Sequence, residues 1–164
     1  MSLEATAFWG LALVLLASSL AVVLSRNLFH SVLYLALALV TTAGLFLLLG
    51  AEFLAAVQIL LYAGGVVTIM VFAIMLTERL VGERLAQTNR QIATGAIVSG
   101  AVLVALLLFL TRAELPRELP PLPRDLTTEI GRTLLTRFAL PFELLAVLFL
   151  AALLGALFFA RRED

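Results

Sequence analysis

The sequence predicts an all-α membrane protein with five transmembrane helices. Its 164 residues are 63% hydrophobic, whereas soluble domains contain about 45–50% apolar residues, and the mean hydropathy is +1.13. Five apolar segments approach or exceed the ~18–20 residues that a membrane-crossing helix needs. They cover residues 5–24, 28–49, 53–76, 92–110 and 140–160. Because these segments fill most of the chain, we expect one membrane domain over residues 1–164, with the lipid bilayer as a partner.

The first segment has the features of a span rather than of a signal peptide. A signal peptide carries basic residues ahead of an apolar core of about 7–15 residues. Here Glu4 precedes a longer apolar run and Arg26 follows it. Only three residues separate the first segment from the second, and three separate the second from the third. Such short connections make successive helices antiparallel neighbours, so the first three segments are expected to form a compact unit.

The second half of the chain contains two longer connections. A polar hinge is predicted over residues 77–91, and an extramembrane loop over residues 111–139. Four prolines favour an extended first half of that loop. In its second half three apolar residues recur at helical spacing, and these are Leu126, Ile130 and Leu134. The pattern fits a short amphipathic helix on the membrane surface, capped by Asp125 or Thr127, and it also fits an ordered loop without a helix.

Arginine residues predict the orientation of the spans. With five spans, one side of the membrane receives Arg26, the arginines of the hinge and the C-terminal pair Arg161 and Arg162. The arginines on the other side all lie in the long loop, where they are mixed with acidic residues. Basic residues close to the spans favour the cytoplasmic side. We therefore expect the N-terminus outside and the C-terminus in the cytoplasm.

Composition also limits the chemistry. The chain has no cysteine, one histidine (His30) and a formal net charge of zero. The absence of cysteine excludes disulfides and thiolate-bound clusters, and a lone interfacial histidine is more often structural than a ligand. We expect no catalytic residue, no metal site and no cofactor in this chain, and the neutral charge gives no indication of nucleic acid as a partner.

The third segment contains polar residues and glycines where a lipid-facing helix would have apolar side chains. Gln58 and Tyr62 lie four residues apart, on one face of an α-helix, and Gly64 and Gly65 follow them near the middle of the span. One interpretation is close helix packing, with small residues at the contact and polar groups bonded to a neighbouring helix. The other is a π-bulge, because glycine lowers the energetic cost of leaving α geometry and such bulges often mark functional sites.

Two carboxylates complete the set of candidate residues. Glu52 opens the third segment, and Glu143 lies in the fifth, where we expect Pro141 to occupy the first helical position. Acidic residues at helix starts are stabilised by the helix dipole, which is the structural interpretation of both. A role in a proton path is the alternative. No carboxylate, lysine or histidine lies at mid-membrane depth, which argues against ion transport by this chain alone.

These residues resemble a known family. The run RNLFHSVLYLALALVTTAGLFLLLGAEFLAAVQILLYAGGVVTIMVFAIMLT, with its AEFLA..Q....YAGG core, resembles subunit J of proton-translocating NADH–quinone oxidoreductase. That subunit is the bacterial counterpart of mitochondrial complex I subunit 6. The later segment TLLTRFALPFELLAVLFLAALLGA is similar to the last span of the same family. Leu28 departs from the family pattern, which often has proline there.

The resemblance implies a π-bulge at the positions matching Tyr62 to Val67, which include Val66. In the family this bulge interconverts with α-helix and is linked to a water-filled proton path toward neighbouring subunits. Glu52 and Glu143 match acidic positions of the family. The implied function is that of a membrane-arm subunit coupling quinone reduction to proton translocation. A purely structural helical spacer and a small independent transporter remain alternatives.

The resemblance also implies the surroundings of the chain. The expected partners are antiporter-like, quinone-site and small helical subunits in a bacterial inner membrane. NAD(H), FMN, iron–sulfur clusters and quinone are expected elsewhere in the complex. The electron donor stays open between NADH, ferredoxin and another reduced carrier.

Overall fold

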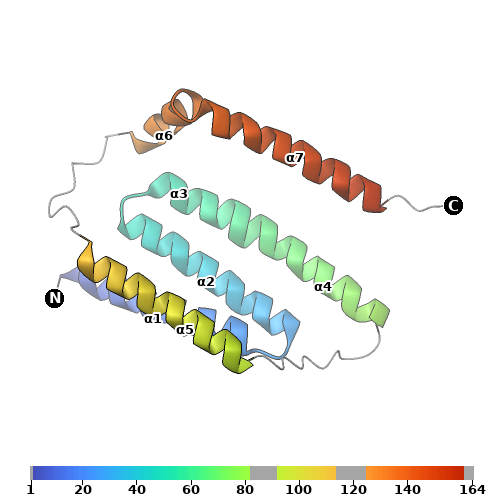
Figure 1. Ribbon diagram of the computed structural model, residues 1–164, viewed down its shortest axis with the longest axis horizontal. Helices are drawn as coiled ribbons and strands as arrows, with labels where there is room; N and C mark the ends of the chain where they lie inside the picture. Colours follow the sequence, from blue (N-terminus) through green and yellow to red (C-terminus); the bar gives the residue numbers. More distant parts are fainter. Residues whose placement is uncertain (1, 82–91, 114–124, 161–164) are drawn as a thin grey trace. The chain divides into compact units, whose positions relative to one another are not determined.

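The computed structural model describes residues 2–81, 92–113 and 125–160. These residues are almost entirely helical, and five of the helices are long and apolar enough to cross a membrane (Figure 1). This confirms the predicted fold class. The spans are Leu3–Leu24, Leu28–Leu48, Glu52–Thr77, Ala93–Arg112 and Ala139–Ala160. The packing contacts fall into two units, Met1–Leu119 and Pro120–Asp164, which are described separately below.

The first two spans are α1 (Leu3–Leu24) and α2 (Leu28–Leu48), joined by a turn that caps both helices. The Asn27 side chain accepts hydrogen bonds from the backbone N–H groups of Phe29 and His30, at 2.9 and 3.2 Å. It therefore satisfies two of the amide groups that lack a partner at a helix start. The Ser25 N–H donates to the Ala21 carbonyl at 2.9 Å and closes the end of α1.

A second tight turn leads from α2 into the third span. Gly50 has a φ of 73°, in the left-handed region that glycine adopts without strain. The Gly50 N–H donates to Leu47 at 3.0 Å, and the Ala51 N–H donates to Phe46 at 2.8 Å. This pair of bonds is a Schellman motif, in which glycine ends the helix and reverses the chain. The expected antiparallel arrangement of the first three spans follows from these two turns.

The third span is one continuous helix with two windings. It begins as α3 (Glu52–Val57), continues as a π-helical segment η1 (Gln58–Val66), and ends as α4 (Val67–Val81). Since α4 extends to Val81, the predicted hinge begins too early at residue 77. The rest of that hinge, residues 82–91, lies outside the described residues.

Helix α2 is the centre of this unit. It contacts α1 and every part of the third span, so it lies between them (Figure 1). Small residues make the close approach: Ala43 has 0% of its surface exposed, and a Cβ added at Gly44 would lie 3.1 Å from the Leu11 side chain. Packing of this kind drives helix association in a bilayer.

The remaining helices are α5 (Ile92–Arg112), which forms the fourth span, and α6 (Leu126–Leu135) and α7 (Ala139–Ala160) of the second unit. A helix in the second half of the long connection was one of two expectations, and α6 confirms it. Asp125, one of the two expected capping residues, caps α6 by accepting from the Thr128 N–H at 3.1 Å. The four prolines lie outside the described residues.

Candidate coupling site in the third span

The predicted winding change in the third span is present and is longer than expected. It covers nine residues, Gln58 to Val66, and not only the vicinity of Tyr62 to Val67. At its start the Gln58 N–H still donates to Leu54, four residues back. At its end the Val67 N–H donates to Tyr62, five residues back, and also to Gly64. Val67 is thus the first α-helical residue after the segment, and its amide closes the last π turn.

The π segment changes which residues face α2. Ala55 in α3 and Val67 in α4 are both buried, and α2 contacts both helices. At 3.6 residues per turn, the residue about three turns below Ala55 is Val66. Instead, Val67 is 7% exposed while Val66 is 45% exposed. The π segment has therefore inserted one residue, so that everything after it faces α2 one position later.

The two glycines differ in how tightly the π winding constrains them. A Cβ built on Gly64 would lie 3.3 Å from the Ile59 carbonyl oxygen, and one on Gly65 would lie 3.8 Å from the Leu60 oxygen. In both cases the nearby carbonyl is five residues back, the acceptor position of a π-helix. The distance at Gly64 is tighter than an ordinary van der Waals contact, and backbone atoms have to move to relieve it. Gly64 is the more constrained glycine, and the sequence alone did not distinguish the two.

The polar side chains of the π segment η1 are not fully buried. Tyr62 is 50% exposed on this chain, and Gln58, the first residue of η1, is partly buried. None of the residues in η1 is fully buried. The Tyr62 phenol is therefore open to contacts beyond those made within this chain.

The two candidate carboxylates occupy different helix positions. Glu52 is the first residue of α3, as the helix-start interpretation expects, and it is exposed. The expectation for Glu143 is wrong, because α7 begins at Ala139 and has no acidic residue in its first turn. The Phe142 N–H already donates to Phe138 at 3.0 Å. Pro141 is tolerated at the third position because the first four amides of a helix need no intrahelical acceptor. Glu143 is exposed and lies in the second turn.

Among residues 2–81, 92–113 and 125–160, no three His, Asp or Glu side chains gather closely enough to hold a metal ion. The arrangement instead consists of backbone winding, two glycines and two polar side chains inside a multi-pass membrane protein of five spans.

Comparison with known proteins assigns the chain to a family. Residues 18–159 match the family described as NADH-ubiquinone/plastoquinone oxidoreductase chain 6. The chain is 35% identical over 164 residues to the F(420)H(2) dehydrogenase subunit J of Methanosarcina mazei, covering 99% of this chain and 93% of the relative. It is 36% identical over 162 residues to the NAD(P)H-quinone oxidoreductase chain 6 of Leptolyngbya boryana, covering 98% and 81%.

The class is therefore that of membrane subunits of quinone oxidoreductases. Within it, the chain belongs to the NADH-ubiquinone/plastoquinone oxidoreductase chain 6 family, the subunit J family of complex I. The relatives are subunits of multi-subunit enzyme complexes, so the partners of this chain include other subunits of such a complex.

Proposed function

We propose that this chain couples quinone reduction to proton translocation in the membrane arm of a redox-driven proton pump, and that its third span does so by changing winding. The observation that carries the proposal is the register offset across η1. Val67 is buried where uniform α winding would bury Val66. A uniform α winding of the same span would offer α2 a different contact, and two such alternative contacts are what a two-state element requires.

The size of the movement follows from helix geometry. Removing one inserted residue rotates one part of an α-helix by about 100° relative to the other. In this span the change would exchange Val67 for Val66 at α2 and would reorient the exposed Tyr62 against its surroundings. A phenol in a membrane needs a hydrogen-bond partner. We propose that neighbouring subunits supply that partner in one winding and that water enters in the other.

The wider setting is part of the same proposal. The chain would act without an active site of its own, as one membrane domain beside antiporter-like, quinone-site and small helical subunits. NAD(H) or another reduced carrier, FMN, iron–sulfur clusters and quinone would be bound elsewhere. The chain would lie in a bacterial inner membrane with its N-terminus outside. Glu143, one turn inside α7, is a better candidate for a proton path than Glu52, which the helix start explains.

The pair Gly64→Ala and Gly65→Ala tests the proposal. Alanine stabilises a helical backbone relative to glycine by about 1 kcal/mol at either position. Only at Gly64 does the added Cβ also press on a carbonyl of the π winding, so only there is that winding selectively disfavoured. We expect the Gly64→Ala complex to assemble and to lose most of its proton translocation. The Gly65→Ala complex should keep more of it.

The measurement uses inverted membrane vesicles, with the pH gradient and quinone reduction followed together. NADH and F(420)H(2) serve as donors in separate assays, since the names of the relatives include both kinds of enzyme. Equal and normal pumping in both variants would contradict the switching role. A parallel loss of assembly and pumping in both would support the structural-spacer alternative instead.

A further inference from the structure

We propose that α6 is an interfacial anchor whose apolar side is covered by the acyl chains of the bilayer, at the surface where the fifth span begins. The proposal concerns the second unit alone and does not depend on the coupling role of the third span. It assigns a lipid-binding surface to a segment that lies outside the membrane-crossing helices.

The side chains of α6 are divided between two sides of the helix. Leu126, Ile130 and Leu134 recur on one side at intervals of four residues. On the other side, Thr128 and Arg132 are exposed, and so is Thr136 at the C-cap that follows α6. A helix with a strongly apolar side, a polar side and low overall hydrophobicity is typical of helices that lie in the interface plane of a membrane.

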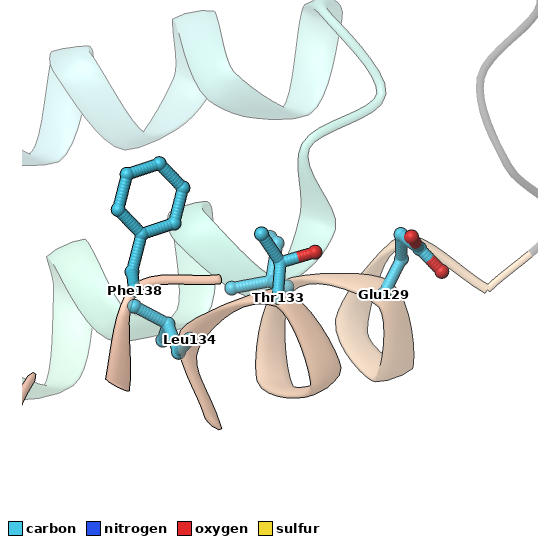
Figure 2. Close-up of a pocket in the computed structure, with 5 residues that line it drawn as sticks. Glu129, Thr133, Leu134 and Phe138 are labelled. Atoms are coloured by element: carbon cyan, nitrogen blue, oxygen red, sulfur yellow. The ribbon is translucent and has the colours of Figure 1, made fainter. Parts of the chain in front are cut away.

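The apolar side contains a hollow. Its volume is about 260 Å³, and Figure 2 shows Glu129, Thr133 and Phe138 projecting from the same side of the chain around it. Ile130 and Leu134 complete the lining. Phe138 comes from the turn after α6, so the hollow is built by α6 and by the entry to α7 together.

Backbone bonds hold α6 close to the membrane entry. The Phe138 N–H donates to the Thr133 carbonyl, and the Phe142 N–H donates to the Phe138 carbonyl, both at 3.0 Å. One residue, Phe138, is therefore bonded to α6 on one side and to α7 on the other. Since α7 is a membrane span, the apolar side of α6 lies within a short turn of the point where the chain enters the bilayer.

Charge and composition favour lipid over protein as the occupant. Arg132 on the polar side of α6 and Arg137 in the turn after it are exposed, and phosphate groups of lipids can meet both side chains. The Arg137 guanidinium lies 5.8 Å from the centre of the Phe138 ring, at the boundary between the polar and apolar sides. An apolar side that lies opposite a polar side containing a basic residue is the composition of helices that lie in the membrane interface.

Site-directed spin labelling tests the proposal, and the chain is suited to it because it has no native cysteine. The labelled variants are Leu134→Cys on the apolar side and Arg132→Cys on the polar side as the matched control. Each is assembled in the full complex in lipid nanodiscs, and the unsubstituted complex gives the background labelling. Accessibility is measured to oxygen, which concentrates in hydrocarbon, and to a water-soluble nickel chelate.

We expect the oxygen-to-nickel accessibility ratio to be several-fold higher at position 134 than at position 132. A label at 134 that is shielded from both reagents would overturn the proposal, because a polypeptide would then cover the surface. A label at 134 that meets the nickel chelate as freely as the label at 132 would also overturn it, because that surface would face water.

Discussion

Helix α2 and the third span pack against each other, yet they are stabilised in different ways. In α2, the Asn27 cap and the Schellman turn at Gly50 fix both ends, and its Ala43 is fully buried. The π segment next to it has no fully buried residue. Both helices touch along η1, because α2 contacts η1 as well as α3 and α4. The difference lies in burial: Ala55 before η1 and Val67 after it are buried, and no residue within η1 is. A well-packed helix beside a winding without a buried side chain is the arrangement on which the proposed change of winding rests.

The polar groups of the α1–α2 contact strengthen this difference. The buried Ser18 hydroxyl donates to the Val14 carbonyl at 2.8 Å, and the buried Thr41 hydroxyl donates to Leu37 at 2.7 Å. Both hydroxyls are satisfied inside their own helices. They need no partner from elsewhere, in contrast to the exposed phenol of Tyr62.

The largest effect on stability is expected from placing a larger side chain in the buried contact of α2. In Ala43→Leu a large side chain replaces a residue with no exposed surface, and overpacking of this kind costs about 1–3 kcal/mol. The purified full chain in detergent should therefore unfold at a lower temperature than the unsubstituted chain. Ala105→Leu on α5, where the alanine is exposed on this chain, is the control. Equal unfolding temperatures for the two variants would mean that α1, α2 and the third span do not pack closely around Ala43.

A smaller effect on stability is expected from the pair Val67→Ala and Val66→Ala. The pair directly tests which of the two residues faces α2. In π winding only Val67 is buried, so its truncation removes packing contacts worth about 1 kcal/mol, and truncation of Val66 removes almost none. The Val67→Ala chain should be the less stable in detergent, measured by thermal unfolding. The reverse order would mean that uniform α winding predominates in the isolated chain.

The sequence predicted the five spans because apolar length is a strong local signal, and it predicted the two short turns because only three residues separate neighbouring apolar segments. The cap at Asn27 and the Schellman turn at Gly50 became visible only in the structure. The extent of η1 was not predictable in the same way. Its nine residues differ from an α-helix in the hydrogen-bond register, and the offset shows in the burial of Ala55 and Val67 on either side of them. Such tertiary constraints leave little local signature beyond the two glycines.

The residue at which a helix begins was also hard to predict from local sequence. Pro141 is compatible with any of the first few positions of a helix, so its presence alone did not fix the start of α7. In the structure Phe138 is hydrogen-bonded in the turn before α7, the helix begins at Ala139, and Glu143 lies beyond its first turn. For the cap of α6 the sequence left two candidates, Asp125 and Thr127. In the structure Asp125 is the cap, and its carboxylate accepts from both the N–H and the hydroxyl of Thr128.

The smallest effect on stability is expected at the Asp125 cap of α6, which is a helix end outside the membrane spans. Hydrogen bonds from the Thr128 hydroxyl and backbone N–H lower the pKa of Asp125 below its ordinary value. A carboxyl group with a lowered pKa stabilises the folded state above its unfolded pKa, and that contribution is lost as the pH falls through the folded value. The start of α6 should therefore fray only in acid, below about pH 4.

Hydrogen exchange at the Thr128 amide, corrected for the intrinsic pH dependence of exchange, measures this fraying. Asp125→Asn is the matched control, because asparagine caps helices about as well as aspartate but does not titrate in this range. The unsubstituted chain should lose protection at Thr128 on acidification, while the Asp125→Asn chain should keep a constant protection. Fraying with the same pH profile in both chains would assign the effect to another group. The Asp125 carboxylate would then contribute to the cap only as a hydrogen-bond acceptor, with no dependence on its charge.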